Sequence, residues 1–216
     1  MAYSALFFDF DGVLADSVEV KSDAFAKIFE CYGPEIQEMV VDHHRINGGM
    51  TRRDKFRYYH DEFLKKSLSD GEIDLLCNRF SELVVDRVVA SPEIPGAEDF
   101  LKRWYRETIC FVVSATPDDE IVRIVDKRGL ARYFKAVLGS SMTKQQNIEY
   151  LINQYALKEK ECLFFGDAES DYRAAKACGM NFLGIVPGPD APLLRSAPEV
   201  QWARNFIEFS VKSFRF

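Results

Sequence analysis

The 216-residue chain is poor in cysteine, histidine and tryptophan, and it contains no long apolar run. Its five cysteines are odd in number and include no Cys-x-x-Cys pair, which argues against a disulfide framework and against a zinc site. A membrane span requires roughly 20 apolar residues, so we expect no membrane partner. Free thiols are typical of a reducing compartment. The sequence therefore predicts a cytoplasmic protein.

Basic residues are also in short supply, since 28 Lys and Arg face 34 Asp and Glu and leave a formal net charge of -6. A field of that sign repels phosphate backbones, so a nucleic-acid partner is not expected. Hydrophobic residues make up 47% of the chain and charged residues 29%, which excludes disorder and allows a sizeable core. The length favours one domain with a smaller insertion.

Short apolar runs alternate with helical patterns along most of the chain. The runs are 5–8, 109–113, 136–138, 162–165 and 182–186. They are continuous rather than alternating, as in strands that are covered on both faces of a parallel sheet. The helical patterns between them are 97–106, 118–128, 144–155 and 170–178. The sequence therefore predicts an α/β fold with a doubly wound, Rossmann-like parallel sheet, whose ligands bind beyond the carboxyl ends of the strands.

Residues 16–91 interrupt this alternation, because they contain helical patterns at 18–32, 51–66 and 71–89 and no convincing strand. Asp16 and Glu19 form a capping-box-like pair at the start of the first of these helices. The position of residues 16–91 after the first strand suggests that they form a lid over the ligand site. We expect an α/β core domain of residues 1–15 and 92–216, with a small helical cap domain at 16–91.

Two aspartates, Asp9 and Asp11, stand at the end of the first expected strand, ahead of Gly12. Period-2 geometry places both side chains on one face, although the end of the strand can splay them apart. A carboxylate beside a divalent cation can attack phosphorus and form an aspartyl-phosphate. A second carboxylate can protonate the leaving oxygen and then take a proton from water. Alone, the motif is equally explained by a polar turn.

The next two strand ends carry a hydroxyl and a lysine. Ser114 and Ala115 follow the second strand, where a small hydroxyl and backbone N–H groups at a helix start form an anion seat. Ordinary helix capping also explains a serine there. Lys144 begins the helix after the third strand, against the preference of the helix dipole for anions. This misfit indicates a negative partner, with a solvated surface lysine as the alternative.

The fourth strand is followed by three acids in five positions, Asp167, Glu169 and Asp171. Such a group suits the oxygen coordination of Mg²⁺. Helix capping accounts for Asp171 but poorly for Asp167. The conjunction decides the interpretation, because four strand ends supply a nucleophile with an acid, a hydroxyl, a lysine and metal carboxylates, and separate structural explanations would be needed for each.

These residues resemble the motifs of the haloacid dehalogenase-like superfamily, in the branch with a small helical cap after the first strand. The resemblance covers essentially the whole chain and rests on Asp9-Phe10-Asp11-Gly12-Val13, Ser114, Lys144, and Gly166-Asp167 with Asp171. The chain is most similar to the phosphoglycolate-phosphatase and β-phosphoglucomutase subgroup, whose opening Asp-Gly-Val-Leu and Asp-Ser pattern is echoed by residues 11–17.

The resemblance implies a catalytic role for each core motif. Asp9 would be the nucleophile, and Asp11 the general acid and base. Ser114, with Ala115 beside it, would hydrogen-bond the transferred phosphoryl group, and Lys144 would neutralise that group and hold Asp9. These roles suit phosphoryl transfer, which depends mostly on positioning and on neutralisation of charge.

The resemblance also implies Mg²⁺ as the cofactor. Asp9 and Asp167 would be ligands through their carboxylates, and Asp11 through its backbone carbonyl. Asp171 would either ligate the ion or orient its bound waters. The second aspartate of the first motif, which dehalogenases of this superfamily lack, points to phosphate chemistry.

The implied activity is Mg²⁺-dependent hydrolysis of a small phosphomonoester, such as a sugar phosphate, through an aspartyl-phosphate. Mutases of the β-phosphoglucomutase type resemble the chain at Thr51-Arg52 but usually carry a histidine where this sequence has Lys21. A phosphomutase is therefore the alternative, and a non-catalytic phosphate-binding module is another. The Schiff-base chemistry of phosphonoacetaldehyde hydrolases is a further alternative, with Lys21 or Lys55 as the amine.

The cap contains a local excess of basic residues within an acidic chain. The basic side chains are His43, His44, Arg45, Arg52, Arg53, Lys55, Arg57 and His60. We expect one or two of them, Arg52 first, to bind the leaving group of the substrate through a planar two-point contact, with Lys21 as a further substrate-binding residue. A solvated helix face is the alternative for any single one. The partner is thus a small phosphorylated metabolite, and the chain is expected to be a monomer or a weak homodimer.

Overall fold

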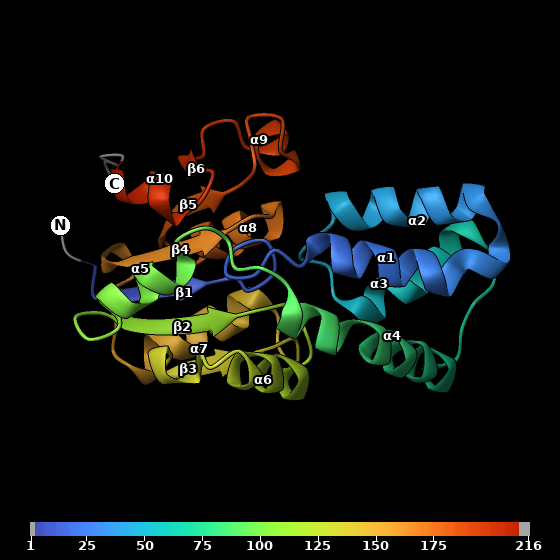
Figure 1. The fold of residues 1–216 in the computed structure, drawn as a ribbon, viewed down its shortest axis with the longest axis horizontal. Coiled ribbons are helices and arrows are strands. Elements are labelled where there is room, and N and C mark those ends of the chain that lie inside the picture. The colour runs from blue at the N-terminus through green and yellow to red at the C-terminus, as the bar shows by residue number, and fades with distance from the viewer. Residues whose placement is uncertain (1–2, 212–216) are drawn as a thin grey trace.

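The computed structural model describes residues 3–211 and has two lobes, an α/β core and a bundle of helices (Figure 1). A six-stranded sheet in the order β3-β2-β1-β4-β5-β6 runs through the core, and every pair of neighbouring strands is parallel. Its strands are β1 (Ala5–Phe8), β2 (Ile109–Val113), β3 (Ala136–Leu138), β4 (Cys162–Gly166), β5 (Asn181–Ile185) and β6 (Trp202–Ala203). This confirms the predicted doubly wound parallel sheet.

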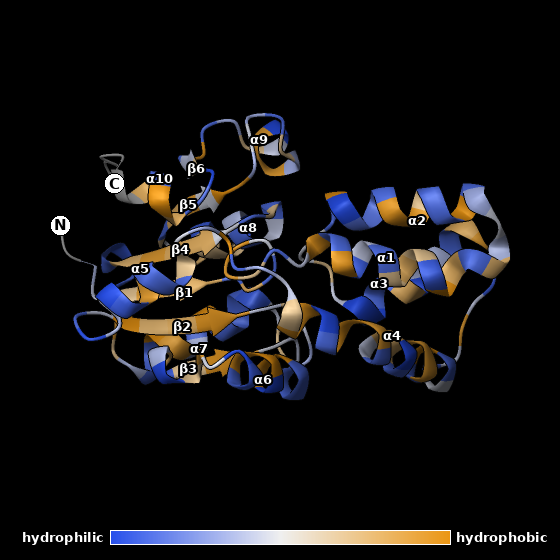
Figure 2. Cartoon of the chain, in the orientation of Figure 1, coloured by the Kyte–Doolittle hydropathy of each residue, from blue (hydrophilic) through white to orange (hydrophobic). Residues whose placement is uncertain are grey.

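Both faces of the sheet are buried, which explains the continuous apolar runs of its strands (Figure 2). Phe8 and Phe165 point to one face and pack with Phe100 of α5. Phe7 and Phe164 point to the other face, in a cluster that includes Ile148 of α7. The core helices are α5 (Ala97–Trp104), α6 (Asp118–Lys127), α7 (Lys144–Gln154), α8 (Glu169–Ala177), α9 (Pro192–Ser196) and α10 (Phe206–Val211).

The second lobe consists of the helices that lie between β1 and α5. They are α1 (Val18–Phe29), α2 (Pro34–Ile46), α3 (Arg52–Tyr58) and α4 (Asp70–Ala90), and a π-helical turn at Tyr59–Phe63 extends α3. Aromatic rings fill the interior of this lobe, among them Phe25, which packs on both Phe56 and Phe80. The lobe stands at the carboxyl ends of the strands (Figure 1).

The structure differs from the sequence prediction at three places in these elements. Helix α2 was not predicted, and of its two buried residues, Val40 and His44, only Val40 is apolar. The N-cap residue of α1 is Ser17 rather than Asp16, and no side-chain hydrogen bond is made at this N-cap. Strand β6 is only two residues long, too short to leave a periodic signal. Among the described residues, no helix is both long and apolar enough to cross a membrane.

Candidate active site

The loop after β1 places Asp9 and Asp11 at the carboxyl edge of the sheet. The backbone N–H of Asp9 donates to the carbonyl of Phe165 at 2.9 Å, which continues the pairing with β4. Gly12 then turns the chain with a φ of +76°, a conformation that side-chain-bearing residues rarely adopt. A Cβ at this glycine would stand 2.4 Å from an oxygen of Asp167. The glycine therefore permits the close approach of the two acidic loops.

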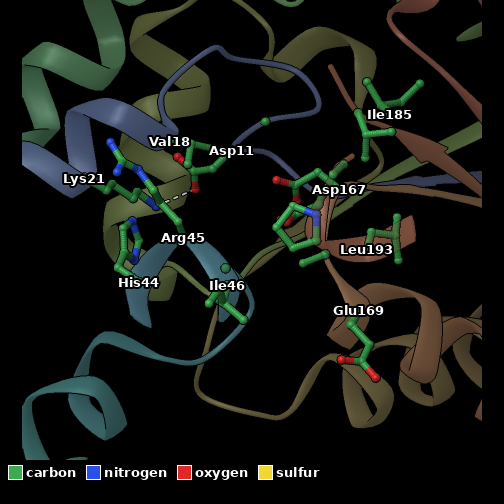
Figure 3. Close-up of a pocket in the computed structure, with 18 of the residues that line it drawn as sticks. Asp11, Val18, Lys21, His44, Arg45, Ile46, Asp167, Glu169, Ile185 and Leu193 are labelled. Atoms are coloured by element: carbon green, nitrogen blue, oxygen red, sulfur yellow. Dashed lines mark hydrogen bonds and ion pairs between the residues drawn. The ribbon is translucent and has the colours of Figure 1, made fainter. Parts of the chain in front are cut away.

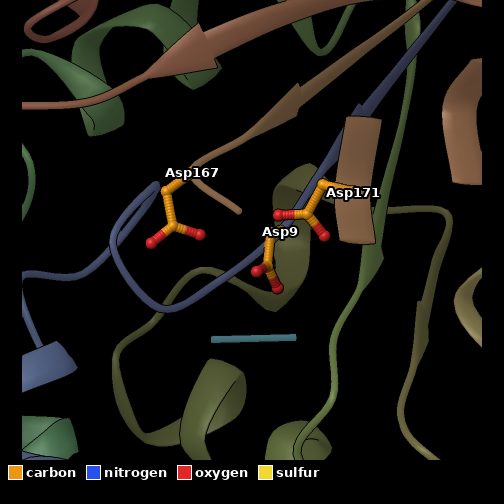
Figure 4. Close-up of side chains that lie close together, drawn as sticks. All are labelled: Asp9, Asp167 and Asp171. Carbon is orange, nitrogen blue, oxygen red and sulfur yellow. The ribbon is translucent and has the colours of Figure 1, made fainter. Parts of the chain in front are cut away.

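Three carboxylates converge at this edge, as Figure 4 shows. Asp9, Asp167 and Asp171 each offer an oxygen atom, and these atoms all lie within 4.8 Å of one another. Asp9 follows β1, whereas Asp167 follows β4 and Asp171 lies in the first turn of α8. The parallel topology thus brings together acids that are more than 150 positions apart in the sequence.

Lys144 lies among these carboxylates. Its Nζ is 2.8 Å from Asp9 and also contacts Asp171. The lysine is the first residue of α7, which begins with Thr143 as N-cap and Gln146 in a capping box. The helix dipole alone disfavours a cation at this place, but two carboxylates outweigh it. The predicted negative partner of Lys144 is therefore this pair of acids.

The pKa values of the cluster record a shortage of positive charge. Burial, with smaller contributions from Asp171 and Asp11, raises the pKa of Asp9 even though Lys144 lowers it. Burial and repulsion from Asp9 and Asp171 raise the pKa of Asp167 well above its usual range. Burial alone would lower the pKa of Lys144, but the neighbouring carboxylates raise it above its ordinary value.

A divalent cation fits this donor set. When the three carboxylates are ionised, they carry three negative charges against the single positive charge of Lys144, which leaves about two to be neutralised. Carboxylate oxygens are the ligands that Mg²⁺ takes in proteins. The carboxylate of Asp11 lies outside the cluster, and its expected contribution through the backbone carbonyl stays a prediction.

Asp11 has a separate set of partners. Ser17 donates to one of its oxygens at 2.6 Å, and the other contacts Lys21 and lies 3.3 Å from the Thr116 hydroxyl. Burial pushes the pKa of Asp11 upward, but the ammonium of Lys21 and the hydrogen bonds from Lys21 and Ser17 hold it below its usual range. In this arrangement Asp11 is an ionised carboxylate that can accept a proton.

The loop after β2 contributes Ser114, Ala115 and Thr116. Ser114 is buried, and its hydroxyl accepts the backbone N–H of Thr116 at 3.1 Å. Ala115 and Thr116 line the cavity described below. The hydroxyl of Thr116 also accepts from Lys21 at 2.9 Å. This loop therefore joins the anion seat expected from the sequence to the Asp11 network.

A cavity of about 870 Å³ lies between the two lobes, with Asp9, Asp11 and Asp167 on the core side. Figure 3 shows Lys21, His44, Arg45 and Ile46 of the helical lobe on one side, and Asp167, Glu169, Ile185 and Leu193 of the core on the other. Lys55 and Arg52 also line this cavity. Phosphate-sized and larger small molecules have room in it.

Arg52 has a different partner from the one that we expected. Its guanidinium makes a two-point contact with the carboxylate of Glu120 in α6, at 2.7 and 3.1 Å, and also binds the hydroxyl of Ser81 at 2.6 Å. Both ions of the pair are buried. The guanidinium of Arg52, which we expected to bind a substrate anion, is thus occupied by Glu120 of the core. This ion pair joins the helical lobe to α6.

Sequence reasoning missed Ser17, Thr116 and Glu120. Ser17 appeared only within the pattern of residues 11–17, and Thr116 was not singled out. Glu120 lies in the acidic first turn of α6, Asp118–Glu120, where the helix dipole sufficiently explains an acid. Only the packing of the two lobes shows that this particular side chain is buried against Arg52.

The glycines of the loop before α3 explain how the two lobes meet. A Cβ at Gly49 would stand 1.6 Å from Oγ and 2.6 Å from Cβ of Ser170, at the start of α8. A Cβ at Gly48 would meet the side chain of Ala168 at 3.5 Å, which is ordinary contact. This loop therefore lies close against the core, and the close approach depends on Gly49.

Comparisons with known proteins agree with this geometry. Residues 6–185 match the family described as haloacid dehalogenase-like hydrolase. Among curated proteins, the chain is 23% identical over 206 residues to phosphoglycolate phosphatase 1 of Pseudomonas aeruginosa, with 88% of this chain and 73% of that protein covered. It is also 23% identical over 190 residues to a fructose-1-phosphate phosphatase of Escherichia coli, with 85% and 96% covered.

The fold is shared with solved structures. A haloacid dehalogenase-like family hydrolase from Streptococcus pneumoniae superimposes with a TM-score of 0.72 at 18% identity, covering 97% of this chain and 98% of that one. A sequence identity of this size supports a shared fold and nothing further. The likeness extends over both the core and the helical lobe, since almost the whole of each chain is covered.

Proposed function

The chain belongs to the haloacid dehalogenase-like hydrolase family, and we propose that it is a Mg²⁺-dependent phosphatase that hydrolyses a small phosphomonoester through an aspartyl-phosphate. One observation carries the proposal: the buried carboxylate of Asp9 is held by Lys144 within an acidic cluster on the floor of a cavity. The names of the relatives, which are phosphatases of phosphoglycolate and fructose 1-phosphate, support a small phosphorylated substrate.

The first step is an attack of an Asp9 oxygen on the phosphorus of the substrate. The bond between Asp9 and phosphorus forms while the ester P–O bond breaks, and the leaving oxygen takes a proton from Asp11. The low pKa of Asp11 in the free protein is raised when a phosphate dianion approaches, because a nearby negative charge favours the protonated carboxyl. Protonation of Asp11 therefore accompanies substrate binding.

In the second step a water molecule attacks the phosphorus of the aspartyl-phosphate. Asp11, now ionised, takes a proton from the water, and the bond between phosphorus and Asp9 breaks to release inorganic phosphate. Lys144 neutralises charge on Asp9 and on the phosphoryl group throughout. The loop at Ser114 and Ala115 provides hydroxyl and N–H groups for the phosphoryl oxygens.

The proposed ligands of Mg²⁺ are the carboxylates of Asp9 and Asp167 and the backbone carbonyl of Asp11, with Asp171 either ligating or orienting bound water. When bound, the ion supplies charge neutralisation for the transferred phosphoryl group. Without it, the mutual repulsion of the three carboxylates opposes an ionised Asp9. Asp9 is thereby expected to gain nucleophilicity when the cation is present.

We propose residues 16–91 as a cap domain over a core domain of residues 1–15 and 92–216. The cap would exclude bulk water from the aspartyl-phosphate, so that a single positioned water reacts. Mutases of the β-phosphoglucomutase type usually carry a histidine where this chain has Lys21, which contacts Asp11, and this difference favours the hydrolytic reaction over mutase chemistry. The proposal includes a cytoplasmic location and a monomer or weak homodimer.

The test is hydrolysis of p-nitrophenyl phosphate with Mg²⁺ and with excess chelator. We expect turnover only with the metal, and a loss of about a thousandfold or more in Asp9→Asn, since no other group is placed to replace the nucleophile. Asp86→Asn is the matched control, because Asp86 is an exposed carboxylate on α4. Thermal unfolding verifies that both variants are folded.

Two outcomes contradict the proposal. Metal-independent turnover that survives in Asp9→Asn would exclude Asp9 as the nucleophile. No turnover of this compound or of a panel of sugar phosphates and phosphoglycolate by the folded protein would favour a non-catalytic phosphate-binding module.

A further inference from the structure

The basic residues of the cap differ in whether the protein itself neutralises them. Arg45 binds Glu19, Arg52 binds Glu120, and both Arg53 and Arg57 bind Asp70. Among the described residues, Lys55 is the one Lys or Arg between positions 43 and 60 for which no carboxylate partner is found. The excess of positive charge that the sequence shows in this stretch is therefore concentrated at one side chain.

Lys55 is also the most deeply buried of these cations, with 2% of its surface exposed. Its Nζ lies 2.7 Å from Nδ1 of His44, which is itself buried, and 5.7 Å from the centre of the Phe25 ring. These contacts are with an imidazole and an aromatic ring, neither of which is an anion. Both Lys55 and His44 line the cavity that reaches Asp9.

A buried ammonium without an anion is costly, since burial of a charge is compensated only by pairing or by hydrogen bonds. His44 remains neutral and provides one acceptor, because burial and the positive charge of Lys55 lower its pKa well below the usual range. The ammonium has three N–H donors in all, and at the wall of a cavity the others are available to a ligand.

We propose that Lys55, positioned by His44, binds a second anionic group of the substrate, so that the preferred substrates are small phosphomonoesters whose leaving group carries a carboxylate or another phosphate. This inference rests on the proposed phosphatase function and adds the substrate class. The phosphate lies at Asp9 and Lys144 on the core side, and the second anion lies at Lys55 on the cap side of the same cavity.

The electrostatics of the free protein agree with this role. Burial, then repulsion from Lys21, lowers the pKa of Lys55 to about 7, while Asp11 and Asp167 partly oppose the change. An anion in contact with the ammonium would raise that pKa and fix the charge. The lysine is thus poised to become fully charged when the matching ligand enters, whereas Arg52 is already committed to Glu120.

The test compares substrate pairs that differ in one anionic group, using the full-length protein with Mg²⁺. The pairs are 2-phosphoglycolate with 2-hydroxyethyl phosphate, for a carboxylate, and fructose 1,6-bisphosphate with fructose 1-phosphate, for a second phosphate. In at least one pair, we expect the wild-type protein to show a higher kcat/KM for the member with the additional anionic group. The pair that shows this preference identifies which anion is recognised.

The variant is Lys55→Met, which keeps most of the side-chain volume and removes the ammonium. We expect the preference for the anionic member to fall about tenfold or more, as for the loss of a charge-assisted hydrogen bond. Arg53→Met is the matched control on the same helix, because Arg53 is partly exposed, pairs with Asp70 and Asp74, and does not line the cavity. Its preference should equal that of the wild type.

Binding to the Asp9→Asn protein separates recognition from turnover. In that background, calorimetry should show that Lys55→Met weakens binding of the member with the second anionic group about tenfold. Binding of the member that carries the phosphate alone should change by less than about threefold. An equal loss for both members, or no loss, would overturn the role of Lys55. Failure of the wild type to hydrolyse any of the four compounds would instead count against the proposed phosphatase function.

Discussion

The two sides of the cavity carry unneutralised charge of opposite sign. On the core side, Asp9, Asp167 and Asp171 share a single lysine, so negative charge is left over. On the cap side, acids of the protein neutralise the two arginines that line the cavity, Arg45 and Arg52. Among the described cap residues that line it, Lys55 is the one cation for which no carboxylate partner is found. The sites where a cation and an anion would bind are therefore indicated by charged side chains that the protein itself does not fully neutralise. The number of charged residues on each side does not indicate them.

The largest effect is expected at the core side, in Lys144→Met. This change leaves Asp9 and Asp171 buried without their cation, which costs about 3–5 kcal/mol of stability when one partner of a buried ion pair is removed. Turnover of p-nitrophenyl phosphate should fall by a factor on the order of 100–1,000 or more. Urea unfolding and steady-state kinetics measure the two effects.

Lys158→Met is the control for that change, because Lys158 is exposed and pairs with Glu161 at the surface. It should alter stability by less than about 1 kcal/mol. If Lys144→Met behaved like this control, Lys144 would not be the cation that neutralises the acidic cluster.

The second prediction concerns the ion pairs that join the two lobes. Glu120→Ala leaves the buried guanidinium of Arg52 unpaired and should cost about 3 kcal/mol or more in urea unfolding. Asp86→Ala breaks the exposed pair with Lys127, which also joins α4 to α6, and should cost less than about 1 kcal/mol.

A double variant sharpens this result. Arg52→Met with Glu120→Leu removes both buried ions and should recover most of the lost stability, because apolar replacements of a buried pair are often neutral. A double variant as unstable as Glu120→Ala would mean that the stability depends on the hydrogen bonds of Arg52 to Ser81 and Cys77 within the helical lobe, rather than on the pairing of charge between the lobes.

The third prediction uses the low pKa of Lys55, about 7 in the folded protein, against about 10.4 for an unperturbed lysine. Between these values the unfolded chain binds more protons than the folded one, so the stability contributed at this site rises with pH. Lys55→Met lacks this contribution, and its advantage over the wild type should shrink by up to about 1.4 kcal/mol per pH unit above pH 7.

The groups that act on Lys55, which are Lys21, Asp11, Asp167 and Lys144, are present in both proteins, so the difference removes most of their own contribution. The charge of Lys55 lowers the pKa of His44, and the comparison is therefore made at pH 7 and above, beyond the ordinary range of a histidine. Urea unfolding at pH 7 and pH 9 measures the difference, and a constant value would show that Lys55 titrates normally.

The smallest expected effect is at the loop where cap and core touch. In Gly49→Ala the added methyl collides with Ser170, so the cap must shift, and we expect kcat/KM to fall about tenfold, as for a small misplacement of positioning groups. Gly48→Ala is the matched neighbour, with ordinary contact to Ala168, and should change kcat/KM by no more than about twofold. Equal effects of the two changes would mean that this contact does not set the cap position.

Much of the fold was predictable, because the signals involved are local. Five of the six strands carry continuous apolar runs, since both faces of the sheet are covered. Gly129 and Gly179, which follow the ends of α6 and α8, adopt the positive φ values that end helices. Helix α2 escaped prediction although it is amphipathic, because one of its two buried positions is the polar His44 and apolar residues alone do not mark its inward face.

The convergence of the core motifs was also predictable, once the strands were taken as parallel. Asp9, Lys144 and Asp167 each follow a strand or lie at the start of the next helix, and the carboxyl ends of parallel strands meet at one edge. Their chemical types then indicate phosphate and a metal ion. Their roles in catalysis stay predictions until the variants are measured.

The α/β fold, the place of the helical insertion and the grouping of acids and lysine at the strand ends follow from the order of the residues, because each depends on a short stretch or on the general rule of parallel sheets. Which basic residue of the cap is left for a ligand follows from the packing of the two lobes. Arg52 and Lys55 are three positions apart in similar surroundings along the chain, yet one meets Glu120 and the other meets His44. Pairing across the two lobes depends on distances between residues remote in sequence, and no local pattern records it.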